Sequence, residues 1–135
     1  MERETMERET MEALARQVRA ALEANDLSAY SDLLDPNVTW GPPHSKAPPC
    51  RNPEQVLAWY RRAKEAGARA GVSEVVVIGD RILVGLMVTR RRTATAGDGE
   101  AQRWQALTVR RSKIVDIVGF DEKSEAMAHV EEPAQ

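Results

Sequence analysis

The stretch from Arg81 to Thr89, RILVGLMVT, constrains the fold most because it is apolar on both of its alternating faces. Successive side chains of a β-strand point to opposite sides of the sheet, so each side of this strand carries bulky aliphatic residues. A strand that is apolar on both sides has to be covered on both sides. The chain's own helices can provide one cover, and a second copy of the chain can provide the other. The side with Gly85 carries the smaller residues, so we expect a cavity there.

Length and composition set the class of protein. A chain of 135 residues is long enough for one domain with a real core. The net charge of −2 argues against nucleic-acid binding. Arginines cluster at 61–62, 90–92 and 110–111, and the last two clusters are interpreted as solvated strand ends. The single cysteine excludes an internal disulfide and favours a reducing compartment. No apolar run is long enough for a membrane span or a secretion signal, so we expect a cytoplasmic protein that contacts no membrane.

The chain is predicted to hold one domain over residues 12–130, with a frayed helical extension at 1–11 and a tail at 131–135. The extension contains a tandem MERET repeat followed by Met11, and its three methionines leave the natural start open. Helical periodicity predicts helices over 12–24, 27–34, 53–66 and 123–130. Asp26 is expected to cap the second helix, and Asn52, Pro53 and Gln55 to start the third.

The strands are predicted at 38–40, 72–78, 82–91, 102–110 and 114–120. Residues 35–37 (Asp-Pro-Asn) are expected to form a turn, and residues 41–52 hold four prolines and are expected to be irregular. Short turns between the last four strands predict an antiparallel meander. The fold class is therefore α+β.

This order of elements resembles the nuclear-transport-factor-2-like, or SnoaL-like, superfamily. The resemblance rests on AALEAND at 20–26 with LLDPNVTW at 33–40, on CRNPEQVLAWY at 50–60 and on RRSKIVDIVGFD at 110–121. It implies a cystatin-like cone, in which a curved antiparallel sheet wraps around a long helix beside two N-terminal helices. The superfamily contains isomerases, cyclases, hydrolases and non-catalytic binding domains, so the resemblance implies a pocket but no particular reaction.

The resemblance, checked against alternation, also predicts which residues line the pocket. These residues are mixed small, apolar and hydroxyl-bearing, as a small-molecule cavity requires. They are Val18, Trp40, Val56, Trp59, Tyr60, Leu83, Gly85, Met87, Trp104, Ala106, Thr108, Ile117, Gly119 and Asp121. The opposite, outer face is then expected to carry Val84, Leu86, Leu107, Val109, Ile114, Val118 and Phe120. That outer face is too apolar to remain wet, which favours a sheet-to-sheet homodimer, and the alternative is a partial cover by the last helix.

Ketosteroid isomerase chemistry needs a carboxylate base, a tyrosine and a protonated carboxylic acid. Ungapped matching places the family's tyrosine on Val18, its base on Gly41 and its acid near Ala106, none of which moves a proton. Only Tyr60 matches, as a supporting tyrosine. The resemblance therefore does not extend to that activity.

Three residues remain as candidates for acid–base catalysis. Asp121 is predicted to point into the cavity as a general base, with Trp104 and Met87 keeping its surroundings apolar. Its position between a strand and a helix favours the alternative, in which it caps the last helix. His44, in the proline-rich loop, is a candidate proton donor or a solvated loop residue. Tyr60 is the third candidate, as a hydrogen-bond donor.

The remaining chemistry-bearing residues give weaker signals. Arg51 and the following helix N-terminus would lower the pKa of the Cys50 thiol, but a small residue packed under the loop explains this cysteine as well. Trp40 and Trp104 with Tyr60 are expected to form flat apolar walls, suited to a ring-bearing ligand. The two histidines lie too far apart in the sequence to support a metal site, and no cofactor is expected.

Two functions follow from these observations. The first is a SnoaL-like domain that binds a small hydrophobic molecule in an aromatic-walled pocket, with no reaction assigned. The second is a cofactor-independent isomerase, cyclase or hydrolase that acts on a small hydrophobic substrate by acid–base catalysis. Few titratable groups are predicted to face the cavity, which favours the first function.

Overall fold

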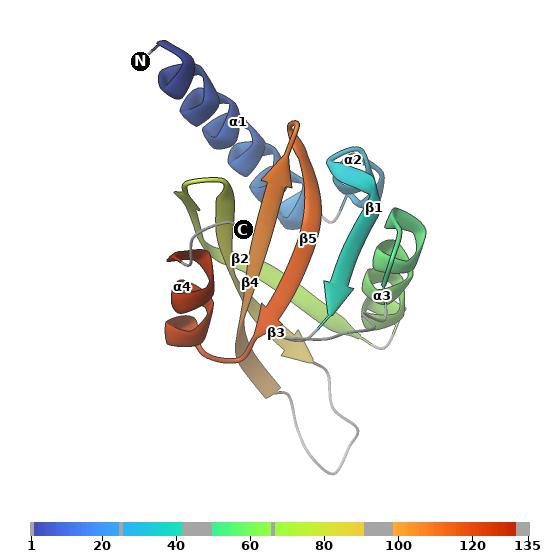
Figure 1. The fold of residues 1–135 in the computed structure, drawn as a ribbon. Helices are drawn as coiled ribbons and strands as arrows, with labels where there is room; N and C mark the ends of the chain where they lie inside the picture. The colour runs from blue at the N-terminus through green and yellow to red at the C-terminus, as the bar shows by residue number, and fades with distance from the viewer. Residues whose placement is uncertain (1, 25, 42–49, 66, 91–98, 132–135) are drawn as a thin grey trace.

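The structure is a computed structural model, and it describes residues 2–24, 26–41, 50–65, 67–90 and 99–131. These residues form four helices and a five-stranded sheet (Figure 1). In chain order the elements are α1 (Glu2–Ala24), α2 (Leu27–Ser31), β1 (Leu34–Gly41), α3 (Pro53–Glu65), β2 (Ala68–Ile78), β3 (Arg81–Arg90), β4 (Gly99–Arg110), β5 (Lys113–Phe120) and α4 (Lys123–Glu131). Among the described helices, none combines the length and the apolar character that crossing a membrane would need.

The helix starts form through the capping interactions that the sequence predicts. The Asp26 carboxylate accepts a hydrogen bond from the backbone N–H of Ala29 at 3.0 Å and caps α2. At the start of α3, the Asn52 side chain accepts from the Gln55 N–H at 2.9 Å, and the Gln55 side chain accepts from the Arg51 N–H at 2.7 Å. These bonds satisfy backbone donors that a helix start would otherwise leave unpaired.

The sheet has the strand order β1-β5-β4-β3-β2. Strands β2 to β5 pair antiparallel in sequence order, which confirms the predicted meander. Gly79 takes the positive φ of 62° that the β2–β3 turn requires, and Arg111 and Ser112 take φ values of 52° and 64° between β4 and β5. Strand β1 pairs parallel with β5 and closes the other side of the sheet.

Strand β1 is longer than predicted, and the predicted turn at 35–37 lies inside it. The Asp35 carboxylate still accepts from the Asn37 N–H at 2.8 Å, as in an Asx turn. The pairing with β5 shifts between Leu34 and Thr39, so the local turn survives as an irregularity in the strand. Helix α2 ends correspondingly early, at Ser31.

The two faces of the sheet carry different residues from those predicted. On β3 and β4, the residues that pack against α1, α2 and α3 are Ile82, Val84, Leu86, Leu107 and Val109. The predicted pocket residues Leu83, Trp104 and Ala106 instead belong to a second apolar cluster on the opposite, outer face. The prediction placed Val84, Leu86, Leu107, Val109 and Ile114 on the outer face, and this was wrong; Val118 and Phe120 do lie there.

The outer cluster is covered by α4, which was the alternative to a dimer in the sequence-based interpretation. Ala126 and Val130 of α4 are buried against the cluster. The Lys123 ammonium lies 5.3 Å from the centre of the Trp104 ring and pairs with Glu74 of β2 at 3.1 Å. Figure 1 shows α4 on the side of the sheet away from α3. Most of both faces of the central strands is therefore covered within one subunit.

Gly85 has a packing role and does not border a cavity. A methyl group added at this position would lie 2.6 Å from the Cζ3 atom of Trp104 and 2.8 Å from the hydroxyl oxygen of Ser73. The Trp104 ring thus occupies the space that a side chain at position 85 would need. Glycine at this position therefore allows the ring to pack directly on the backbone of β3.

We expect Gly85→Ala to lower the free energy of unfolding by about 1–3 kcal/mol, because the added methyl group forces Trp104 out of its position. The matched control is Gly71→Ala on β2, where nothing lies within 4 Å of the added atom. That control should change stability by no more than about 0.5 kcal/mol. Urea unfolding followed by circular dichroism measures both, and equal stabilities for the two variants would contradict the packing role.

Candidate functional site

Aromatic side chains from β1, α2 and α3 meet on the side of the sheet that faces the helices. The rings of Trp40 and Tyr60 stack at an interplanar angle of 24° with centroids 5.2 Å apart. Tyr30 meets Tyr60 edge to face at 5.6 Å. Tyr30 is fully buried, whereas Trp40 and Tyr60 are half-buried. The stacked pair therefore forms a flat apolar wall that is partly open to solvent.

The sheet positions this wall through residues on β4 and β5. The carboxamide of Gln105 on β4 lies 3.4 Å from the Tyr60 hydroxyl, and either group can donate. Gly119 of β5 is paired with Gln105, and an added methyl group there would lie 3.9 Å from the indole nitrogen of Trp40. Ile117, next to Trp40 in the parallel pairing, is fully buried beneath the same wall.

The two tyrosines of this cluster stay neutral at ordinary pH. Burial raises the pKa of Tyr30 well above its usual value, and the neighbouring Tyr60 adds to the increase. Burial also raises the pKa of Tyr60, although hydrogen bonding to Gln105 acts in the opposite direction. The buried Tyr30 hydroxyl has no hydrogen-bond partner of normal geometry among the described residues. Neutral phenols donate hydrogen bonds but do not accept a proton from a substrate.

Cys50 holds the edge of β1 in place. Its backbone N–H and C=O exchange hydrogen bonds with Trp40 at 3.2 and 3.0 Å. The side chain is 1% exposed, and burial raises the pKa of its thiol while the charge of Arg62 opposes the increase. This geometry agrees with the packing interpretation of Cys50 and differs from the lowered pKa that a nucleophile needs.

An ion pair connects β4 to the residue that follows β5. The guanidinium of Arg103 on β4 donates to the carboxylate of Asp121, which directly follows β5. Arg103 and Asp121 are each two residues beyond the paired residues Gln105 and Gly119, so alternation places them on the same, helix-facing side of the sheet. The Asp121 side chain is 78% exposed. The carboxylate is therefore solvated and charge-paired, and it does not lie in the apolar surroundings that we predicted.

The structure brings together only part of the predicted pocket. The predicted residues Val18, Trp40, Val56, Tyr60, Ile117 and Gly119 lie on the helix-facing side, in or beside the same core. The predicted residues Leu83, Gly85, Met87, Trp104, Ala106 and Thr108 lie on the outer side, so they share no surface with Trp40 and Tyr60. The reason is that β3 and β4 are apolar on both faces, and alternation alone cannot assign the faces. His44 lies outside the described residues.

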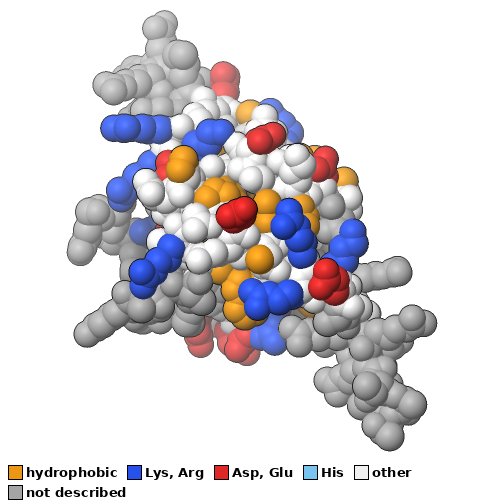
Figure 2. Space-filling view, turned by 90° about the vertical axis from the view of Figure 1, so that its right-hand side faces the viewer, with side chains coloured by type: hydrophobic (Ala, Val, Ile, Leu, Met, Phe, Trp, Pro, Cys, Tyr) orange, Lys and Arg blue, Asp and Glu red, His pale blue; other side chains and the backbone are white. Residues whose placement is uncertain are grey.

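Trp59 was also predicted to line the pocket, and it lies at the outer margin of the site. Its ring meets Trp40 at 6.3 Å between centroids, and it is 47% exposed. The guanidinium of Arg62 lies 5.1 Å from the centre of the Trp59 ring. Figure 2 shows the side of the molecule that carries α2 and α3, where apolar side chains gather near the centre among charged ones.

Three residues of the site did not emerge from the sequence: Tyr30, Gln105 and Arg103. Gln105 had a readable signal, because it is the single amide side chain within the apolar run from Trp104 to Val109. A buried polar residue in such a run needs a partner, and Tyr60 provides it. Tyr30 gave no comparable signal, since a tyrosine in a short helix fits ordinary core packing. No group of histidine, cysteine or acidic residues within the described part of the chain has the arrangement of a metal site.

Comparison with known families agrees with this fold. The model of the SnoaL-like domain family matches residues 15–117 of the chain. This match spans most of the sequence, so the chain belongs to the SnoaL-like domain family. No similar sequence was found among curated proteins.

Solved structures share the fold at low sequence identity. A candidate polyketide cyclase from Sinorhizobium meliloti is 21% identical, with a TM-score of 0.62 over 80% of this chain and 94% of its own. A nuclear-transport-factor-2-like protein of unknown function from Burkholderia pseudomallei is 17% identical, with a TM-score of 0.65 over 91% and 98%. TerC, co-crystallised with polyporic acid, is 14% identical, with a TM-score of 0.64 over 91% and 99%. These likenesses confirm the predicted α+β cone class.

The chain has only two tyrosines, and both are in the site, which makes their ionisation directly measurable. We expect phenolate absorbance to appear at higher pH in the folded protein than in urea, where both tyrosines titrate with a pKa of about 10. Because the folded pKa values lie above the unfolded ones, the tyrosines' contribution to stability is complete below about pH 10 and is lost as the pH rises through the folded pKa values. Titration curves that coincide in buffer and in urea would contradict the burial of these hydroxyls.

Proposed function

We propose that this SnoaL-like domain binds a small, flat hydrophobic molecule against the wall formed by Trp40 and Tyr60. The observation that carries the proposal is the stacked, half-buried ring pair with Gln105 beside it. The rings supply apolar area, and the carboxamide supplies a donor and an acceptor that orient a polar substituent. The glycine at 119 leaves the indole of Trp40 room over β5.

The protonation states favour binding over acid–base catalysis at this wall. Among the described residues, the wall contains the titratable group of Tyr60 and is contacted by Tyr30 and Cys50, and burial raises the pKa of each of the three. A general base works best with a pKa near the operating pH, and these groups hold their protons more tightly than that. They suit the recognition of a ligand's polar groups better than proton transfer.

Relatives of the same fold support a small-molecule ligand. TerC was crystallised with polyporic acid, and a ketosteroid-isomerase-like protein from Catenulispora acidiphila was crystallised with trimethylamine. We propose that the present chain likewise binds a small molecule, and that its ligand is a neutral aromatic compound held at the wall of Trp40 and Tyr60. The single cysteine of the chain supports a cytoplasmic location.

Tryptophan fluorescence tests the proposal with 2-naphthol as the probe. We expect saturable quenching of the wild-type protein, and we expect Trp40→Leu to weaken binding up to about tenfold because the stacking contribution is lost. The matched control is Trp104→Phe, which lies on the outer face under Lys123 and should leave the affinity for 2-naphthol unchanged. Absence of saturable quenching, or equal losses in both variants, would refute the assignment of the site.

The alternative function is a cofactor-independent isomerase, cyclase or hydrolase with Asp121 as its base. One observation favours it: alternation places the Arg103–Asp121 pair, which joins β4 to the end of β5, on the helix-facing side of the sheet. A ligand that displaced Arg103 from the carboxylate would free Asp121 as an acceptor. In that case Asp121→Asn should preserve the binding of a converted ligand and abolish its conversion, as followed by NMR of the ligand. Conversion that persists in Asp121→Asn would eliminate this role.

We also propose a homodimer through the part of the outer sheet face that α4 leaves uncovered. Met87 supports it, because this large apolar side chain on β3 is 37% exposed. Helix α4 already buries the largest residues of this face, so the remaining contact area is smaller than the sequence suggested.

Light scattering coupled to size-exclusion chromatography measures the assembly. We expect a mass of twice 15.0 kDa for the wild type and a single-subunit mass for Met87→Glu, because a charge at the centre of an apolar contact is strongly disfavoured. Circular dichroism should show the variant folded, since Met87 is exposed within one subunit. A wild-type mass of one subunit would disprove the dimer.

A further inference from the structure

The two edges of the sheet differ in how their backbone groups are satisfied. The outermost strands are β1 and β2. Trp40 of β1 exchanges backbone hydrogen bonds with Cys50, which protects that edge. On the outer edge of β2, the backbone groups from Val72 to Ile78 have no such partner among the residues that the structure describes. An unprotected edge strand is a ready template for another extended chain.

The free edge is regular over five residues. Glu74 to Ile78 pair without interruption with Gly85 to Arg81 of β3, and the only irregularity of the ladder lies before them, between Val72 and Glu74. Proteins commonly protect an edge strand with proline, a charged side chain or a bulge. This segment, EVVVI, contains no proline and no bulge, and its one charged side chain, Glu74, pairs with Lys123 of α4. Its geometry therefore permits the pairing of a further strand.

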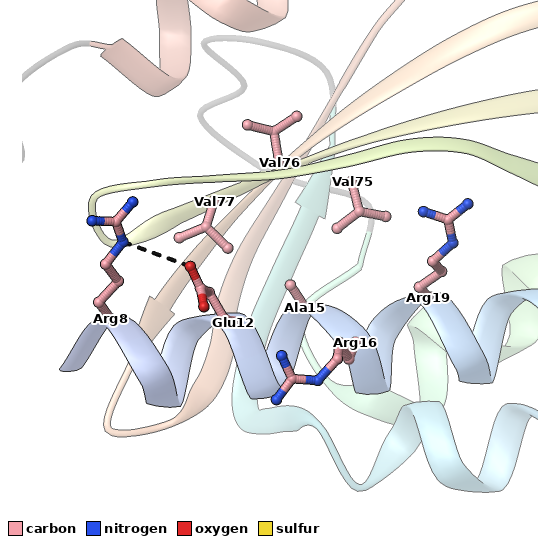
Figure 3. Close-up of a pocket in the computed structure, with 8 residues that line it drawn as sticks. All are labelled: Arg8, Glu12, Ala15, Arg16, Arg19, Val75, Val76 and Val77. Carbon is pink, nitrogen blue, oxygen red and sulfur yellow. Dashed lines mark ion pairs between the residues drawn. The ribbon is translucent and has the colours of Figure 1, made fainter. Parts of the chain in front are cut away.

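A groove runs along this strand, between β2 and α1. It has a volume of about 390 Å³, with Val75, Val76 and Val77 on the strand side. The helix side consists of Arg8, Glu12, Ala15, Arg16 and Arg19. Figure 3 shows Val75 and Val77 pointing toward α1, while Arg8 and Arg19 reach from the helix toward β2 at the two ends of the groove. The groove thus has an apolar floor and a basic rim.

The charges of the rim favour an acidic occupant. Arg8 pairs with Glu12 at 3.6 Å and Arg19 pairs with Glu23 at 3.0 Å, both as exposed pairs that exchange partners at little cost. Arg16 has no ion pair among the described residues. Its positive charge is therefore uncompensated locally and attracts a carboxylate.

The spacing of the arginines matches an extended chain. Arg8 and Arg19 are eleven residues apart in one helix, which corresponds to about 16 Å along its axis. A β-strand covers that distance with about five residues. The regular part of the β2 edge, Glu74 to Ile78, has the same length. The basic rim and the free backbone edge are therefore both matched in length by one extended segment of about five residues.

We propose that the β2 edge and the α1 arginines form a docking groove for an extended acidic segment of a partner protein, which adds to the sheet as a sixth strand. The partner's backbone pairs with β2, its apolar side chains contact Val75, Val77 and Ala15, and its carboxylates meet Arg8, Arg16 and Arg19. This site is separate from the aromatic wall and does not depend on the small-molecule function proposed above.

A five-residue peptide, acetyl-Glu-Val-Thr-Val-Glu-amide, tests the proposal on the full chain. We expect NMR amide shifts concentrated at Val72 to Ile78, together with shifts of the α1 arginine side chains. A peptide N-methylated at alternate residues cannot donate to the edge and should bind at least about tenfold more weakly. A version with lysine in place of glutamate should not bind. Shifts on α1 alone, or equal binding of the N-methylated peptide, would overturn strand addition.

Protein variants then separate the groove from general surface charge. Arg16→Gln combined with Arg19→Gln should weaken the peptide about fivefold to tenfold, because two exposed charge pairs are lost. The matched control is Arg61→Gln, an exposed arginine on α3, which should leave the affinity unchanged. Equal losses in both variants, or binding of glutarate as tight as that of the peptide, would refute a peptide groove.

Discussion

The whole structure depends on the burial of β3 and β4 from both sides. Their helix-facing residues form one core with α1, α2 and α3, and their outer residues form another with α4. Each core alone would leave a continuous apolar face in water, which a small domain does not tolerate. The tail helix is therefore part of the fold, held by Lys123 between Trp104 and Glu74 and by a hydrogen bond from Arg81 to the His129 carbonyl.

The same two-sided burial limits what can be predicted from the sequence. The helix starts at Asp26 and Asn52 and the meander of the last four strands follow from local patterns, and the structure has them all. Which face of β3 points toward the helices cannot be predicted from the sequence, because a strand with aliphatic residues on both faces satisfies alternation in either orientation. The pairing of Gly85 with Trp104 decides the face, and that contact is visible only in three dimensions.

The candidate site was predictable where its residues have a chemical reason to stand out. Trp40 and Tyr60 are rare aromatics in a chain with few of them, and they do meet on the helix-facing side of the sheet. Asp121 was predicted to be shielded by Trp104 and Met87, but those residues lie on the other face, and its partner is Arg103. The pairing arises from the β4–β5 register, which short-range sequence patterns do not specify.

Helix α1 belongs both to the core against which the aromatic wall packs and to the groove at the β2 edge. Val18 is fully buried in the helix-facing core, while Arg16 and Arg19, two and one residues away, line the groove at the β2 edge. Side chains at these spacings point in different directions around a helix, so the groove can be occupied without moving the core. The aromatic wall lies beside β1, at the other side of the sheet from β2. If binding at one site changed the affinity of the other, the effect would have to pass through α1 or across the strands between the two sites. A close-packed interior has low compressibility, so it transmits strain between its parts.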